Sequence, residues 1–189
     1  MKLKSIIGIF AFLSAFSGPT LAQQEANSLS LEAPLNLSNI GEPYIAEKID
    51  DWSLQCVRTQ EGSNTCEMTQ LLLNNQQKPM SKISLFRISG EQGIVAGANI
   101  VVPLETLLTV PLTISFHAET VKQYPYSFCN AIGCIVRVGL TEDEVTILKN
   151  GAQANISVVH ISQPDRSISF GISLNGFTAA YSGTSVLGN

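Results

Sequence analysis

The sequence predicts an all-β protein, an antiparallel β-sandwich with one short α-helix at about residues 142–150. Two observations predict this fold. Short segments that alternate apolar and polar residues recur along the chain, and clusters of turn residues separate them about every 8–12 positions. Long helical patterns between the strands are missing from the sequence, which argues against a parallel α/β sheet.

The alternation is clearest at Trp52, Leu54 and Cys56, whose intervening residues are polar. This period of two is typical of a strand with one buried face. Further strands are predicted at residues 66–72, 82–88, 94–102, 107–116, 124–129, 135–138, 156–161 and 168–174.

The helix begins after Thr141, where Glu142, Asp143 and Glu144 follow in sequence. Thr141 and Glu144 have the spacing of a capping box, and acidic residues are favourable at the positive end of the helix dipole. Lys149-Asn150-Gly151 then supplies the end of the helix. The start of a helix is therefore sufficient to explain the three acids. A calcium site and a catalytic carboxylate pair are the alternative explanations.

The first 22 residues have the order of a secretory signal peptide. Lys2 and Lys4 precede an apolar run from Ile6 to Phe16, and Ala22 ends the segment with a small residue. The run is shorter than the roughly 20 residues that a transmembrane helix needs. We therefore expect cleavage after Ala22, with an uncleaved anchor as the alternative, and no transmembrane segment after cleavage.

The rest of the chain divides into three parts. Residues 23–48 are polar and lack a sustained period, so we expect a flexible leader there, or else an arm that packs late. Residues 49–181 form the predicted sandwich domain, and residues 182–189 form a C-terminal tail.

The charge of the chain argues against nucleic acid as a partner. The sequence holds 15 acidic and 11 basic residues, and its formal net charge is −4. Signal removal takes away two basic residues and no acidic one, and the remaining basic residues are scattered. Binding to a phosphate backbone requires clustered Lys and Arg.

The four cysteines, Cys56, Cys66, Cys129 and Cys134, all follow the signal segment. An even number of cysteines in an exported protein predicts disulfides, with three connectivities. We expect Cys56–Cys66 and Cys129–Cys134, because each pair flanks a local turn. A four-thiolate zinc site is the alternative, but the spacing is not that of such sites. The four residues inside the second pair also argue against a redox motif.

No catalytic, cofactor-binding or metal-binding residues are predicted. His117 and His160 each lie in a strand-like segment, where a single histidine is usually a surface residue. The sequence lacks the nucleophile-elbow, zinc-protease and phosphate-loop motifs, and abundant serine leaves a Ser–His–Asp triad open without favouring it. Phe177 is the candidate contact-surface residue, although the favoured role for it is to anchor the last strand in the core.

Six short motifs follow one another between about residue 50 and residue 181. They are Trp52-Ser53-Leu54-Gln55-Cys56, Cys66-Glu67-Met68-Thr69-Gln70, Val102-Pro103-Leu104, Cys129 to Cys134, Leu148 to Gly151 and Ser173 to Ala180. In their order and spacing these motifs resemble the invasion-associated locus B family of exported Gram-negative bacterial proteins. The resemblance implies a compact β-sandwich without an associated catalytic residue set, in a family named for members that help bacteria enter host cells.

Together these features predict a periplasmic, secreted or outer-membrane-associated protein that is not an enzyme, uses no cofactor and acts by contact with an envelope or host protein. The alternative is a periplasmic protein that binds a small ligand between its two sheets. An envelope hydrolase is a third hypothesis. A filled core would favour the first, an apolar cleft with converging polar groups the second, and a Ser–His or paired-carboxylate cleft the third.

Overall fold

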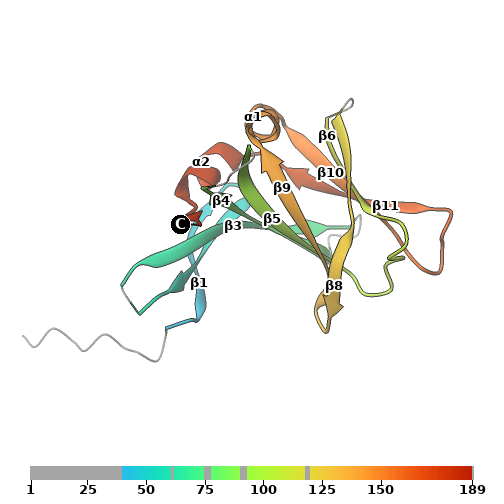
Figure 1. Ribbon diagram of the computed structural model, residues 1–189, viewed down its shortest axis with the longest axis horizontal. Coiled ribbons are helices and arrows are strands. Elements are labelled where there is room, and N and C mark those ends of the chain that lie inside the picture. The colour runs from blue at the N-terminus through green and yellow to red at the C-terminus, as the bar shows by residue number, and fades with distance from the viewer. Residues whose placement is uncertain (1–39, 61, 75–77, 90–92, 118–119, 189) are drawn as a thin grey trace, which may run out of the picture. The chain divides into compact units, whose positions relative to one another are not determined.

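The computed structural model describes residues 40–188 except 61, 75–77, 90–92 and 118–119 (Figure 1). The expected signal peptide and residues 23–39 of the expected leader lie outside the described residues. Two antiparallel sheets and two short helices make up the described chain.

The larger sheet has eight strands in the order β1-β2-β3-β4-β5-β9-β8, with β12 beside β4. All neighbours are antiparallel except β12, which runs parallel to β4. The strands are β1 (Pro43–Ile49), β2 (Trp52–Arg58), β3 (Asn64–Leu73), β4 (Pro79–Ile88), β5 (Ile94–Val102), β8 (Tyr126–Asn130), β9 (Gly133–Thr141) and β12 (Val186–Leu187).

The smaller sheet has four strands in the order β11-β10-β6-β7. They are β6 (Leu112–His117), β7 (Thr120–Tyr124), β10 (Gln153–Val159) and β11 (Ser167–Ser173). Buried residues of the two sheets form one core cluster, which includes Trp52 and Ile100 from the larger sheet and Ile156 and Phe170 from the smaller one. The predicted antiparallel β-sandwich is confirmed.

Alternation of side chains sets the register of the central strands. In β2, Trp52, Leu54 and Cys56 are buried, whereas Ser53 and Gln55 are half-buried on the opposite face. A shift of one residue would exchange these faces, so burial of one face fixes the pairing.

The helix α1 (Glu142–Asn150) has the predicted bounds and the predicted capping box. Thr141 Oγ1 accepts from the Glu144 amide, and the Glu144 carboxylate accepts from the Thr141 amide. Val145 and Leu148 are buried against the core.

A second helix, α2 (Phe177–Gly183), corrects the prediction of a single helix. It has only seven residues, and its N-cap, Gly176, offers no side-chain hydrogen bond. Packing of Phe177, Ala180 and Tyr181 stabilises it, so local sequence signals are weak.

Two predicted boundaries are also wrong. Residues 43–48, assigned to the leader, belong to β1, and the expected tail of residues 182–189 contains the end of α2 and strand β12. β1 leaves most of its side chains exposed, so it shows no alternation, and backbone pairing with β2 holds it. β12 joins the sheet through backbone pairing beside Arg87 and Ile88.

Candidate functional site

Both predicted disulfides are present. Cys56 and Cys66 lie directly opposite each other on β2 and β3, and Cys129 and Cys134 do so on β8 and β9. Each bond therefore fixes one hairpin. The four sulfur atoms are bonded in pairs and are not available as zinc ligands.

A polar junction joins the two sheets at Asp51, Trp52, Gln70 and Ser173. The Gln70 amide lies on the core side of β3, is only 7% exposed, and contacts the β11 backbone. Its Oε1 accepts from the Ser173 amide at 2.9 Å, and its Nε2 donates to the Ser173 carbonyl at 3.0 Å. The Trp52 indole donates to the same carbonyl, and the Ser173 hydroxyl donates to Asp51. We call these four residues the sheet junction.

Phe177, predicted as a contact-surface residue, is instead 1% exposed. Its ring meets Trp52 edge-on at 5.5 Å and stacks with Tyr181 at 5.9 Å. The favoured role in the core is therefore correct, and the candidate role as a contact surface is wrong. Phe177 points inward because α2 packs its apolar face against the core. The preceding residues, Asn175-Gly176, are typical of an exposed turn.

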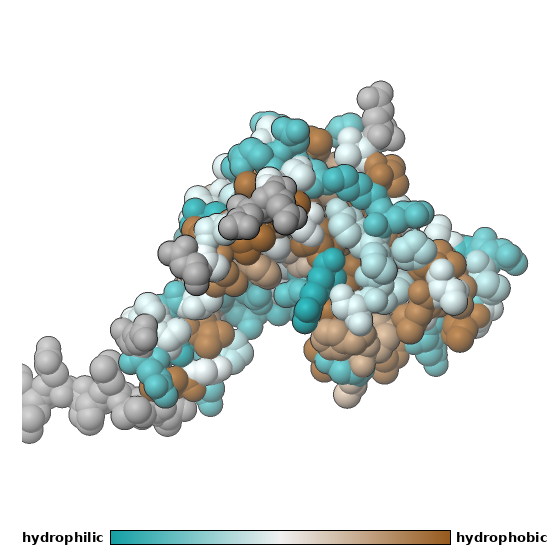
Figure 2. Space-filling model, viewed as in Figure 1, coloured by the Kyte–Doolittle hydropathy of each residue, from teal (hydrophilic) through white to brown (hydrophobic). Residues whose placement is uncertain are grey.

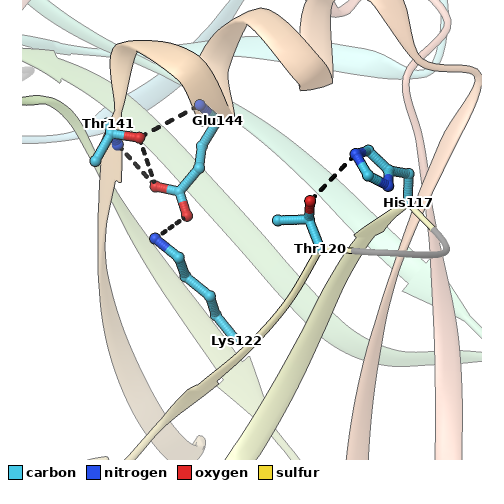
Figure 3. A network of polar contacts seen from close by, with 5 residues as sticks. All are labelled: His117, Thr120, Lys122, Thr141 and Glu144. Atoms are coloured by element: carbon cyan, nitrogen blue, oxygen red, sulfur yellow. Dashed lines mark hydrogen bonds and ion pairs between the residues drawn. The ribbon is translucent and has the colours of Figure 1, made fainter.

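The two histidines lie at opposite ends of the smaller sheet. His117 ends β6 and hydrogen-bonds Thr120 (Figure 3), whereas His160 follows β10 and contacts Glu105 at 3.2 Å and Ser162. The β6–β10 register places His117 beside residue 153, seven positions from His160. At about 3.3 Å per residue the two histidines are roughly 23 Å apart and cannot share one site.

The buried carboxylate of Glu144 is neutralised within the fold. Lys122 from β7 reaches its Oε1 at 2.5 Å, while Oε2 accepts from the amide and hydroxyl of Thr141 (Figure 3). Burial, followed by the negative charge of Glu144, raises the pKa of Tyr124 to about 12. Glu144 thus has a structural explanation as a helix cap and ion-pair partner.

The space between the sheets is nearly filled. An apolar cavity of about 20 Å³ lies there, lined by side chains including Trp52, Ile100, Phe116 and Phe177. Sites for small molecules usually have about 300–1,000 Å³ and a few converging polar groups. A cavity of this size has room for little more than one water molecule and offers it no polar partner.

An exposed apolar surface lies on and beside the larger sheet, at the end formed by the β3–β4 and β8–β9 turns. Residues Leu71, Pro79, Met80, Val101, Pro103 and Ile132 line a groove of about 190 Å³ there, together with Lys82. Leu71 is 59% and Ile132 75% exposed. We call this set the apolar groove. Figure 2 shows apolar surface where the β8–β9 hairpin ends.

The register explains how these distant residues meet. Leu71 pairs with Lys82, Lys82 with Val101, and Val101 with Ile135, so they form one row across four strands. Each is a single apolar or basic residue in an otherwise ordinary strand pattern. The groove residues were therefore not predicted, and only an excess of apolar residues at alternate outward positions could have indicated the surface.

Among the residues described, no group of three His, Cys, Asp or Glu side chains is placed to hold a metal ion. Neither α1 nor α2, the helices of the described part, has the length and apolar character of a membrane span.

The profile of the family described as "Invasion associated locus B (IalB) protein" matches residues 52–185, which is well over half of the chain. The chain belongs to the invasion associated locus B family. The family resemblance noted in the sequence is thereby confirmed, and the matched region runs from the start of β2 to the residue before β12.

Similar proteins carry the same family name. Invasion protein B homologs of Brucella abortus strain 2308 and biovar 1 strain 9-941 are each 25% identical over 170 residues, covering 88% of this chain and 90% of theirs. The crystal structure of invasion associated protein B from Bartonella henselae has a TM-score of 0.60 at 24% identity. The comparison covers 71% of this chain and 90% of that one. This chain and the Bartonella henselae protein thus share a fold.

Proposed function

We propose that the protein is an exported, non-catalytic component of the bacterial cell envelope that acts by direct contact with another protein. The observation that carries this proposal is the combination of a filled core with an exposed apolar groove. The partner is an envelope protein or, in invasive bacteria, a host protein.

Export to the periplasm, the outer membrane or the medium is supported by two features. Residues 1–22 have the order of a secretory signal, and two disulfides stabilise the domain. Disulfides persist in oxidising compartments such as the periplasm and are rare in the cytosol.

Contact through a surface is favoured over ligand binding between the sheets. The interior cavity of about 20 Å³ is far below the size of a small-molecule site. His160 pairs with Glu105 at the rim of the smaller sheet, and the buried carboxylate of Glu144 caps α1. These two groups therefore do not point together into a cleft. These contacts support a non-catalytic role.

The apolar groove supports a protein partner of defined chemistry. Apolar side chains of a partner that fill the groove would remove Leu71 and Ile132 from water. This burial stabilises the complex by about 25 cal/mol per Å² of apolar surface. Lys82 also lines the groove, but its ammonium donates to Gln55 on β2, and Gln55, Leu71 and Lys82 line a neighbouring hollow. An acidic group of a partner that extends past Leu71 toward β2 would therefore meet a positive charge. Relatives named as invasion proteins support a partner on the host cell in pathogens.

The test is cross-linking in intact cells that export the chain, followed by fractionation into periplasm, outer membrane and medium. The variant Leu71→Ser/Ile132→Ser removes the exposed apolar side chains of the groove. Ile161→Ser, 59% exposed and outside the groove, is the matched control. We expect a stoichiometric partner for the wild type and the control, and its loss in the groove variant.

Equal capture of the partner by a folded groove variant would contradict the assignment of the surface. A free periplasmic monomer that captures no protein but binds a small molecule would contradict the proposed function itself. Thermal unfolding of each variant establishes that loss of capture does not result from unfolding.

A further inference from the structure

The edges of the two sheets differ in how well they are protected against pairing with another chain. Natural proteins protect such edges with charged residues, prolines, bulges or short strands. β1 begins at Pro43, carries Glu47 and Lys48 and has an irregular register. β7 carries Lys122 beside a register shift, and five-residue β8 has a register shift and a disulfide.

β11, the outer strand of the smaller sheet on the side opposite β7, has none of these features. Its seven residues, Ser167-Ile168-Ser169-Phe170-Gly171-Ile172-Ser173, include no charge and no proline. Its pairing with β10 continues without interruption from Val159–Ser167 to Gln153–Ser173. β10 and β11 extend side by side toward the end of the smaller sheet (Figure 1).

The sheet junction shows which backbone groups of β11 face outward. Ser173 directs its N–H and C=O away from β10, because both bond to the Gln70 side chain. Backbone direction alternates along an antiparallel strand, so Gly171, Ser169 and Ser167 face the same way. Within the described chain, no backbone hydrogen bond to another element engages them. Gln70 thus completes the edge at Ser173 and leaves the three outward residues open.

We propose that this edge is a self-association surface, on which β11 of a second copy of the chain pairs antiparallel about a two-fold axis at Ser169. The pairing would extend the smaller sheet across two molecules. It is independent of the apolar groove and of the proposed function.

The register follows from which positions are open. Pairing centred on Ser169 places Ser169 opposite Ser169 of the second copy and Ser167 opposite its Gly171. All three open positions are then used. Ser173 would face residue 165 of the second copy, which lies in the turn before β11, so its bonds to Gln70 remain intact. Centring on Phe170 would instead require Ser173 to exchange Gln70 for a strand.

Side chains agree with this register on both faces of the sheet. The outer face would pair small polar or glycine residues, and the core face would pair Ile168 with Phe170 of the second copy. Ile168 is 39% exposed although its neighbours on the same face, Phe170 and Ile172, are buried. Apolar cross-strand pairs contribute roughly 0.2–1 kcal/mol each in antiparallel sheets. The second copy would cover the exposed apolar residue on this face of β11.

Cysteine cross-linking tests the register directly. In the proposed dimer the Cα atoms of the two Ser169 residues are about 5.5 Å apart, which is within the range of a disulfide. The two Ser167 residues are four positions out of register, about 14 Å apart. The native cysteines are all bonded, so Ser169→Cys and Ser167→Cys each add one thiol to the otherwise intact protein. We expect a covalent dimer from Ser169→Cys under mild oxidation and none from Ser167→Cys.

A second pair of variants tests backbone pairing without added thiols. Ser169→Pro removes the outward N–H at the centre of the interface, whereas Ser169→Thr retains it and suits a strand. Three paired residues make a small interface, so sedimentation is measured at increasing protein concentration. We expect the wild type and Ser169→Thr to associate, and Ser169→Pro to remain monomeric.

The proposal is overturned if both cysteine variants cross-link equally or if neither does. It is also overturned if the folded wild type stays monomeric at every concentration. A monomer whose β11 edge binds an unrelated extended peptide would overturn it in the same way.

Discussion

Gln70 holds the two sheets together through the Ser173 backbone, and its replacement by leucine tests this role. The change keeps a side chain of similar size but removes the acceptor at 2.9 Å from the Ser173 amide and the donor at 3.0 Å from its carbonyl. The carbonyl retains the Trp52 indole as a donor, whereas the amide loses its partner. The change also removes the donor at 3.3 Å from the Asp51 carbonyl. The effect is therefore one unsatisfied donor and two lost hydrogen bonds to carbonyls.

The expected cost follows from these three losses. An unsatisfied buried donor costs about 1–3 kcal/mol and a lost hydrogen bond about 0.5–1.5 kcal/mol. Because Ser173 is only half-buried, water can reach it in part, and the lower part of the range applies. We expect Gln70→Leu to lower the free energy of unfolding by about 2–3 kcal/mol. For a chain of this size the melting temperature would fall by roughly 4–12 °C.

The measurement is urea and thermal unfolding followed by circular dichroism under non-reducing conditions. Gln55→Leu is the matched control, because Gln55 is half-buried on β2 and has a side-chain hydrogen bond with exposed-face Lys82. A loss for Gln70→Leu no larger than that of the control would refute the role of Gln70 in joining the sheets.

A variant with a charge separates hydrogen bonding from packing. Gln70→Glu keeps an acceptor for the Ser173 amide but places a carboxylate oxygen against the carbonyls of Ser173 and Asp51. The folded state then favours the protonated acid and raises its pKa. Relative to the wild type, the free energy of unfolding of Gln70→Glu is therefore highest below the unfolded-state pKa of a glutamate, about 4.3. It declines as the pH rises through the higher pKa of this carboxyl in the folded state. A pH-independent loss would contradict this account.

Three further predictions concern the hairpins and the tyrosines. Replacing Cys129 and Cys134 by serine lowers the free energy of unfolding by about 2 kcal/mol, as the chain-entropy model gives for this short loop; unchanged urea midpoints would contradict it. Gly133→Ala destabilises the same hairpin, because Gly133 has φ +148° and an added Cβ would overlap the Val102 carbonyl. Calorimetry should show a lower melting temperature for Gly133→Ala than for Gly62→Ala, because a Cβ added at Gly62 would meet no other atom within 4 Å. Burial raises the pKa of Tyr126 to about 12, and its buried hydroxyl has no hydrogen-bond partner among the described residues. At neutral pH, Tyr126→Phe therefore leaves the free energy of unfolding unchanged or increases it. Because the raised tyrosine pKa values make the folded wild type lose stability between about pH 10 and 12, the variant should lose less stability than the wild type over this range. Alkaline thermal melts of both proteins check this, and a steeper loss in the variant would count against it.

Local signals in the sequence were sufficient for elements whose cause is local. The capping box at Thr141 and Glu144 predicted both ends of α1, because the partners lie three residues apart. Alternation at Trp52, Leu54 and Cys56 predicted β2, since strand burial has a period of two. The two disulfides followed from cysteines that flank short turns.

Elements without a side-chain pattern of their own were missed. β1 pairs through its backbone with the adjacent β2 while most of its side chains stay exposed. β12 and α2 are held by distant partners, β12 by backbone pairing with β4 and α2 by packing of Phe177 on Trp52. The candidate contact role of Phe177 was wrong for the same reason, because its ring is buried against Trp52, which lies 125 positions earlier in the printed sequence.

The sequence by itself thus determined the family, the β class, the capped helix and the hairpin cross-links. Only the tertiary structure decided which surfaces are available. Strand register brings Leu71, Val101 and Ile132 to one groove, and the Gln70–Ser173 contact leaves the rest of the β11 edge open. Both depend on which strands become neighbours, and that choice is made by the whole core rather than by any segment.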